Sequence, residues 1–179
     1  MPASKTPGGE IAVRVREATL SDIPGIVRVN IVTWRDAYKG LIPDGILDAL
    51  SREERVKAFC ALLSEDGVFS YIAEDASRGV AGFVVAGPAR FREFNHEGEV
   101  YSLYVEKEFQ RRGVGALLLG AALNKFREKN VGSVCLMVLE GSRFRRFYEK
   151  NAGEMLCSKS IELQGVPLRV VAYGWELQP

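Results

Sequence analysis

Residues 99–119 read EVYSLYVEKEFQRRGVGALLL, and this stretch predicts the central unit of the fold. Residues 100–105 are dense in β-branched and aromatic side chains, which is typical of a strand. A charged turn follows, with glycines at Gly113 and Gly115, and then a run rich in Ala and Leu. The pattern therefore indicates a strand, a polar turn and a helix in succession.

The turn between this strand and this helix is an expected anion site. The first N–H groups of a helix lack intrahelical partners, and the helix dipole favours negative charge there. Glycine allows a ligand to approach the backbone closely, and Arg111 and Arg112 add positive charge beside it. These features predict a phosphate ligand, with pyrophosphate as the best match.

Two common phosphate-binding motifs do not fit this turn. Gly115 and Gly120 have the first spacing of a P-loop, but Ala121 and Ala122 follow instead of a lysine and a hydroxyl residue. A dinucleotide fingerprint needs a third glycine where this chain has Leu118. The glycines alone are also compatible with a helix that simply begins with flexible residues.

Composition bounds the class of protein. The chain has 179 residues, of which 47% are apolar and 26% charged, so we expect one soluble globular domain over residues 11–179. Residues 1–10 contain one lysine and no apolar core, which indicates a flexible leader and not a signal peptide. The net charge of +1 argues against nucleic acid as a partner. No apolar run reaches the roughly 18 residues that a membrane span needs.

Cysteine and histidine usage argues against a metal site. Cys60, Cys135 and Cys157 are far apart and form no CxxC pair, which favours a reducing cytoplasm over a disulfide framework. We interpret each as a small buried hydrophobic residue. A single histidine, His96, excludes metal sites built from several imidazoles.

Periodicity and turn residues place the other elements along the chain. Besides the strand at 100–105, strands are predicted at 11–16, 68–74, 80–86, 134–139, 154–163 and 168–177. Helices are predicted from the 19–22 cap to about 38, after residue 43, from the 51–54 capping box to 63, from the glycine turn to about 130, and at about 142–151. This order predicts a mixed sheet with helices on its faces, of α/β or α+β type. The strand–helix–strand unit over 100–139 is an expected parallel crossover.

Three regions of the chain resemble one family. The run QRRGVGA at 110–116 resembles the Gln/Arg-x-x-Gly-x-Gly/Ala signature of the GNAT acyl-CoA N-acyltransferases, and it follows a strand as it does there. The segments VLEGS at 138–142 and FYEKNAG at 147–153 are similar to a later region of many members. So is the early stretch TWRDAYKGLIPD at 33–44. The resemblance extends over residues 11–177.

The resemblance implies a fold and a function. The fold is a mixed, mostly antiparallel central sheet of about six to seven strands flanked by helices. The function is transfer of the acetyl group of acetyl-CoA, the co-substrate, to a primary amine of a small molecule or peptide by direct attack, without a metal. Homodimers are common among such proteins. The alternative is a CoA-binding or acyl-CoA-binding sensor, or a structural module, that has lost turnover.

The resemblance also implies the cofactor-binding residues. The pyrophosphate would lie on the amides of the glycine turn, and the pantetheine arm would pair with the preceding strand like an extra strand. Ser142 stands where many members have asparagine, and it would either hydrogen-bond the pantetheine or cap the following helix. The expected set is Leu103, Tyr104, Val105, Arg111, Arg112, Gly113, Val114, Gly115, Ala116 and Ser142.

Two residues are candidates for catalysis. Tyr148 matches the usual tyrosine acid of the family, and the alternative is a tyrosine that packs in the core. Glu99 is the candidate base, because strand alternation would place it on one face with Tyr101, Leu103 and Val105. The alternatives for the base are a solvated Glu99 at the strand end, His96, Glu97, or a water relay.

Some positions depart from the family pattern. Phe144 is bulkier than the usual small residue, and Glu154 replaces the phenylalanine of a Gly-Phe pair. The arginines near Phe144 are interpreted as a solvated face, although they could also meet the acidic end of CoA. Trp34 and Tyr38 lie four residues apart on one side of the first helix, where they pack in the core or line the acceptor cleft.

Overall fold

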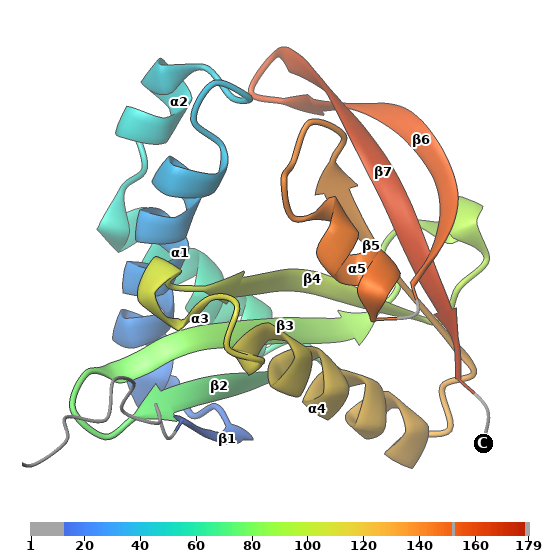
Figure 1. Ribbon diagram of the computed structural model, residues 1–179, viewed down its shortest axis with the longest axis horizontal. Helices are drawn as coiled ribbons and strands as arrows, with labels where there is room; N and C mark the ends of the chain where they lie inside the picture. Colours follow the sequence, from blue (N-terminus) through green and yellow to red (C-terminus); the bar gives the residue numbers. More distant parts are fainter. Residues whose placement is uncertain (1–12, 152, 178–179) are drawn as a thin grey trace, which may run out of the picture.

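The computed structural model describes residues 13–151 and 153–177, and the leader expected at residues 1–10 lies outside them. Seven strands form one sheet in the order β1-β2-β3-β4-β5-β7-β6 (Figure 1). Within this sheet every neighbouring pair is antiparallel except β4 with β5. The strands are β1 (Val13–Glu17), β2 (Phe69–Asp75), β3 (Gly79–Pro88), β4 (Gly98–Val105), β5 (Ser133–Leu139), β6 (Glu154–Leu163) and β7 (Val166–Glu176).

Helices cover both faces of the sheet. They are α1 (Ile23–Ala37), α2 (Asp44–Asp48), α3 (Arg52–Leu63), α4 (Val114–Glu128) and α5 (Arg145–Lys150). Local sequence signals account for several of their ends: Pro24 lies in the first turn of α1, and the Ser51 hydroxyl accepts a hydrogen bond from the Glu54 N–H at 3.3 Å. The predicted helix at 142–151 is shorter in the structure, because the chain makes a turn before α5 begins at Arg145.

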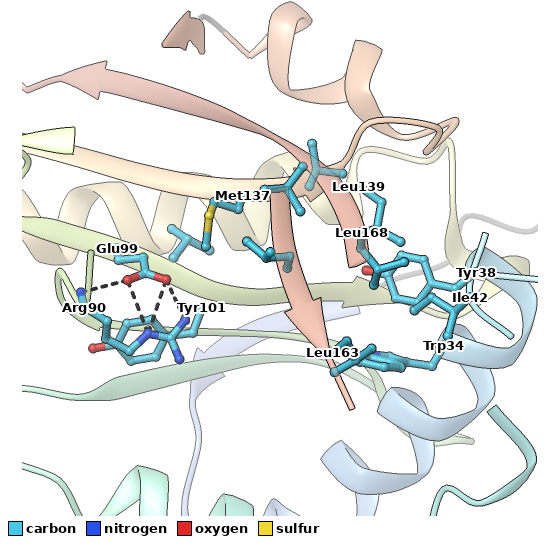
Figure 2. A pocket seen from close by; sticks show the side chains of 14 residues that line it. Trp34, Tyr38, Ile42, Arg90, Glu99, Tyr101, Met137, Leu139, Leu163 and Leu168 are labelled. Carbon is cyan, nitrogen blue, oxygen red and sulfur yellow. Dashed lines mark hydrogen bonds and ion pairs between the residues drawn. The ribbon is translucent and has the colours of Figure 1, made fainter. Parts of the chain in front are cut away.

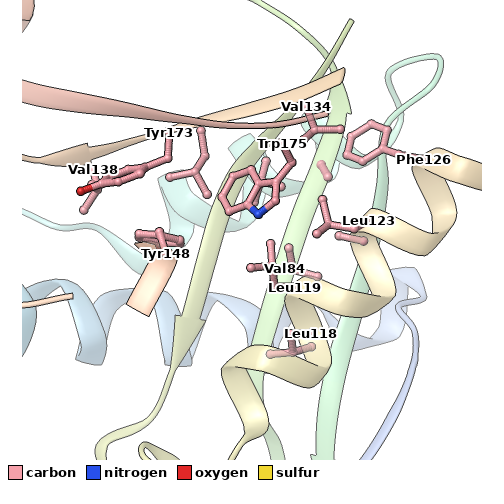
Figure 3. Packing of buried hydrophobic residues seen from close by; sticks show 14 of the residues in the cluster. Val84, Leu118, Leu119, Leu123, Phe126, Val134, Val138, Tyr148, Tyr173 and Trp175 are labelled. Atoms are coloured by element: carbon pink, nitrogen blue, oxygen red, sulfur yellow. The ribbon is translucent and has the colours of Figure 1, made fainter. Parts of the chain in front are cut away.

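Strand β3 separates two apolar clusters. Val84 and Ala86 pack with α4, in the cluster drawn in Figure 3. Phe83 and Val85 pack with α1 and α3 on the opposite face. Successive side chains of a strand point to opposite faces, so an uninterrupted apolar run such as this one is what a strand covered on both sides requires. The expected α/β layering is therefore confirmed.

A β-bulge in β4 corrects one prediction. Val85 pairs with Ser102, but the next residue, Ala86, pairs with Val100, so Tyr101 has no partner on β3. An extra residue reverses the alternation of side chains. Tyr101 packs on the α1 and α3 side, whereas Leu103 packs on the α4 side. The prediction that residues 99, 101, 103 and 105 share one face is wrong for this reason.

The parallel crossover β4–α4–β5 is present as predicted, but its two strands pair only briefly. Their register contains Gly98 opposite Val134 and Glu99 opposite Cys135, and it stops there. Beyond this point β5 turns away with β6 and β7, and an opening forms between the ribbons of β4 and β5 (Figure 1). From residue 100 onward, β4 therefore has a paired strand, β3, on one side only.

Candidate active site

The turn that leads into α4 presents a row of free backbone amides. The first helical bond runs from the Leu117 N–H to the Gly113 carbonyl at 3.0 Å, and the N–H groups of residues 111–116 donate to no acceptor in the described chain. Gly113 has φ +83° and Arg111 has φ +60°, so two left-handed residues bend the turn. The sequence-predicted residues 111–116 thus form one positively charged amide cradle.

Side chains hold this turn in place. The Gln110 side-chain amide donates to the carbonyl of Val105 at 2.8 Å, which fastens the turn to the end of β4. Gly115 faces the ring of Phe147, and an added Cβ there would lie 3.2 Å from that ring. The head of α4 and the helix α5 are therefore in close contact, and glycine at 115 makes this contact possible.

A narrow cleft lies where β4 and β5 part. Its volume is about 40 Å³, and its walls include Leu103 and Tyr104 from β4, Leu136 from β5, and Tyr148 from α5. Because β4 has no neighbour on this side beyond Glu99, its outer edge is open to an extended chain. The structure thus brings Leu103 and Tyr104 together with Tyr148, whereas Val105 is not part of the cleft wall.

Tyr148 belongs both to the core and to this cleft. Its ring lies 5.9 Å from that of Tyr173 and 6.4 Å from that of Trp175, measured between centroids (Figure 3). Its hydroxyl makes no hydrogen bond with another residue that the structure describes. Burial raises its pKa above the ordinary value for tyrosine, so the hydroxyl stays protonated at neutral pH.

A larger cavity of about 210 Å³ adjoins the cleft (Figure 2). One end is bordered by Trp34 of α1, by Tyr38 directly after this helix and by Ile42, and the other end by Glu99 with Arg90. Side chains that line both the cavity and the cleft are Tyr38, Val100, Tyr101, Met137 and Val138. The sequence left open whether Trp34 and Tyr38 pack in the core or line a cleft, and the structure shows both. They border the cavity, and their rings pack against each other with centroids 5.1 Å apart.

Glu99 is fully buried under an arginine at the end of this cavity. Its side chain is 2% exposed, and that of Arg90 is 48% exposed. The Arg90 guanidinium reaches both carboxylate oxygens, with a shortest distance of 2.5 Å, and the Arg90 backbone N–H donates to the same carboxylate at 2.9 Å. The guanidinium also stacks 3.9 Å from the centroid of the Tyr101 ring (Figure 2). This pairing explains how a carboxylate can be buried here.

Other sequence candidates lie elsewhere. The His96 imidazole contacts the Phe94 carbonyl at 2.5 Å, and His96 lines neither cavity. The carboxylate of Glu97 accepts a hydrogen bond from the Gly132 N–H at 2.6 Å. The buried Ser142 hydroxyl accepts from the Phe144 N–H at 3.2 Å, so it stabilises the turn before α5.

Two arginines near the site are bonded to other side chains of the protein, and one cysteine there is buried. Arg143 pairs with Asp36 of α1 at 2.5 Å, and Arg145 donates to the Tyr173 hydroxyl at 3.3 Å. Burial raises the pKa of the Cys135 thiol to about 12, so it is no nucleophile at neutral pH. The prediction that each cysteine is buried holds for Cys135 but is wrong for Cys60, which is exposed. Among the described residues, no group of three or more His, Cys, Asp or Glu could hold a metal ion, and no helix is long and apolar enough to cross a membrane.

Sequence reasoning missed Arg90 as the partner of Glu99 and missed the apolar walls of the cavity. Arg90 is one of several charged residues in its loop, and its position in the sequence does not indicate which carboxylate it pairs with. Met137 and Leu168 line the cavity from β5 and β7, but each lies in an apolar run that predicts a core strand equally well.

Comparison with known proteins adds to this geometry. A family model described as "Acetyltransferase (GNAT) family" matches residues 32–153. The uncharacterized N-acetyltransferase YuaI of Bacillus subtilis is 33% identical over 163 residues, which cover 91% of this chain and 92% of that protein.

Solved structures share the fold. The PaiA N-acetyltransferase of Thermoplasma acidophilum, crystallised in complex with coenzyme A, matches with a TM-score of 0.66 and 19% identity over 89% of this chain and 98% of that one. The ribosomal-protein-alanine N-acetyltransferase of Brucella melitensis matches with a TM-score of 0.71 and 21% identity over 92% and 99%. These similarities confirm the predicted acyl-CoA N-acyltransferase fold.

Proposed function

Because the chain belongs to the GNAT family of acetyltransferases, we propose that it transfers the acetyl group of acetyl-CoA to a primary amine by direct attack. The observation that carries this proposal is the amide cradle of residues 111–116 next to the open edge of β4. An anion-binding turn and an unpaired strand edge, joined end to end, match a ligand with a pyrophosphate at one end and an amide-containing arm at the other.

The residues present fit the two parts of CoA. Six consecutive N–H groups that donate to no acceptor among the described residues suit phosphate oxygens, and Arg111 and Arg112 form no ion pair with these residues. The pantetheine amides suit the free backbone groups of β4, and we assign this role to Leu103, Tyr104 and Val105. Ser142, at the turn before α5, is the last residue that we assign to CoA binding.

Two side chains have proposed roles in proton transfer. Acetyl-CoA supplies an acetyl thioester, which a neutral amine can attack. An amine is protonated at neutral pH, so Glu99 takes the proton from the incoming ammonium. Arg90 contacts both oxygens of Glu99, and the ammonium therefore competes with this guanidinium for the carboxylate. As the C–S bond of the thioester breaks, Tyr148 donates its hydroxyl proton to the departing sulfur, and the tyrosinate takes up the proton that the newly acetylated nitrogen loses.

Acetyl-CoA turnover tests this proposal directly. The purified chain would be incubated with acetyl-CoA and a panel of primary amines, and the free thiol of CoA would be measured together with the acetylated amine by mass spectrometry. We expect amine-dependent thiol release in equal amount to the product. Tight CoA binding without turnover on any amine would favour a sensor, and absence of CoA binding would remove both functions.

We also infer that residues 11–179 act as one domain in the cytoplasm. Support comes from the single sheet that runs through these residues and from the three cysteines, Cys60, Cys135 and Cys157, which are all free thiols. Fractionation of cells that express a tagged chain would test the location.

A further inference from the structure

Most of the residues that line the larger cavity are apolar. Of its fourteen lining residues, nine are Ile, Val, Leu or Met, and three are aromatic. The two others are Arg90 and Glu99, which pair with each other (Figure 2). Three successive elements, β5, β6 and β7, supply most of the aliphatic wall through Met137, Ile161, Leu163, Leu168 and Val170.

This wall discriminates between classes of amine. Arg90 already neutralises Glu99, and two carboxylates outside the lining are engaged too: Asp36 with Arg143, and Glu140 with Arg169. A second ammonium, as in a polyamine, would lose its water against aliphatic side chains without gaining a carboxylate.

The size and position of the cavity define the acceptor further. A volume of about 210 Å³ corresponds to about seven water-sized groups at roughly 30 Å³ each. The cavity adjoins the cleft along Tyr38, Val100 and Met137, and Tyr148 lies in the cleft wall. An amine that points through this shared wall reaches the cleft while its apolar body fills the cavity.

We propose that the acceptor is a small monoamine with an apolar body of about six to eight carbons, such as an alkylamine or an aralkylamine. This inference rests on the proposed acetyl transfer and names its substrate class. Glu99 receives the single ammonium, and the walls formed by β5, β6 and β7 bury the hydrocarbon.

A homologous series tests the proposal on the unaltered protein. The basicity of linear alkylamines is nearly constant from ethylamine to hexylamine, so kcat/KM along the series reports burial of the chain. Each buried methylene should raise kcat/KM about fourfold. The kcat/KM should be higher for hexylamine and for phenethylamine than for spermidine or kanamycin. A flat series, or higher kcat/KM for spermidine or kanamycin, would overturn the substrate class while leaving acetyl transfer intact.

A pair of variants tests the cavity wall itself. Leu163 lines the cavity near the β6–β7 turn and is partly exposed, so Leu163→Asp places a carboxylate in the wall. The ratio of kcat/KM for hexylamine to that for 1,6-diaminohexane should fall at least tenfold. Leu156→Asp, on the same strand but outside the cavity, should leave the ratio unchanged. An unchanged ratio in Leu163→Asp would contradict the proposal, and absence of turnover on every amine would remove both it and the proposed function.

Discussion

Replacing Gly113 by alanine should separate the folding role of this glycine from its role in binding CoA. An ideal Cβ at Gly113 meets nothing within 4 Å, so the substitution causes no clash inside the protein. Its φ of +83° is nevertheless unfavourable for alanine. Gly165, in the turn between β6 and β7, has φ +80° and equally open space. It lies well away from the head of α4 (Figure 1). Gly165→Ala is therefore the matched control.

The two variants should lose similar stability but different affinity. A left-handed alanine costs about 1–2 kcal/mol, which for a chain of this size lowers Tm by roughly 2–8 °C. In Gly113→Ala the methyl group also occupies the open space beside the amide cradle. Loss of one charge-assisted hydrogen bond costs about 1.5–3 kcal/mol, or roughly a 10- to 150-fold increase in the Kd for CoA.

Calorimetric titration with CoA, together with thermal unfolding of both variants, measures these effects. Pantetheine serves as a second ligand, because it lacks the phosphates and its affinity should not depend on residue 113. The reasoning is refuted if Gly113→Ala binds CoA as tightly as the unaltered chain while its Tm falls as much as that of Gly165→Ala. The pyrophosphate would then bind elsewhere.

Three further substitutions address catalysis, the buried ion pair and acid stability. Tyr148→Phe should lower kcat, measured by thiol release, about 100-fold or more without changing the affinity for CoA. It should hardly affect Tm, because the hydroxyl bonds to no described residue. Arg90→Ala leaves Glu99 buried without its cation and should cost about 1–3 kcal/mol in urea unfolding, since water can partly replace a half-exposed guanidinium. Asp22 has its pKa lowered to about 2, chiefly by the hydrogen bond from Arg16. The stability that Asp22 contributes, about 2 kcal/mol, is therefore full above its unfolded pKa near 4 and lost as the pH falls toward 2, so Asp22→Asn should flatten the acid limb of the stability curve.

Controls for these substitutions come from the same molecule. Arg78 pairs with Glu108 at the surface, where both side chains are more than half exposed, so Arg78→Ala should cost less than about 1 kcal/mol. Equal losses of unfolding free energy in Arg78→Ala and Arg90→Ala would show that burial of Glu99 does not increase the contribution of its ion pair to stability. A Tyr148→Phe variant with unaltered kcat would leave Tyr148 as a packing residue, and an unchanged acid limb in Asp22→Asn would rule out the assigned pKa.

Local chemistry predicted much of the fold and the glycine turn at the head of α4. The capping box from Ser51 to Glu54 marked the start of α3 correctly, and the crossover from β4 to β5 was read from the order strand, turn, helix, strand. These features succeed because their causes are close in sequence: the capping box spans four residues, and the turn at the head of α4 spans six. The left-handed Gly113 belongs to the same class, since glycine is the residue that tolerates this conformation.

The failures have causes far apart in sequence. Alternation along β4 was assumed to be unbroken, and the bulge at Tyr101 reversed it, because register depends on how β4 pairs with β3. Glu99 was therefore expected to share a face with Leu103 and Val105, whereas it lines the cavity together with Tyr101. Its partner Arg90 is nine residues earlier in a loop rich in charges, and only the folded loop selects one arginine from that group.

The cavity could not have been predicted from its own residues, because a cavity wall and a packed core require the same side chains. Val100 and Val138 line the cavity although each reads as an ordinary strand residue. These residues line a cavity because β4 separates from β5 after two paired positions, Gly98 with Val134 and Glu99 with Cys135. The bulge at Tyr101 follows directly after that separation begins, and an extra residue in one strand increases its local twist. The divergence of the strands, and with it both the open edge of β4 and the space beside Glu99, is thus a property of pairing between elements, whereas sequence patterns report mainly on single elements.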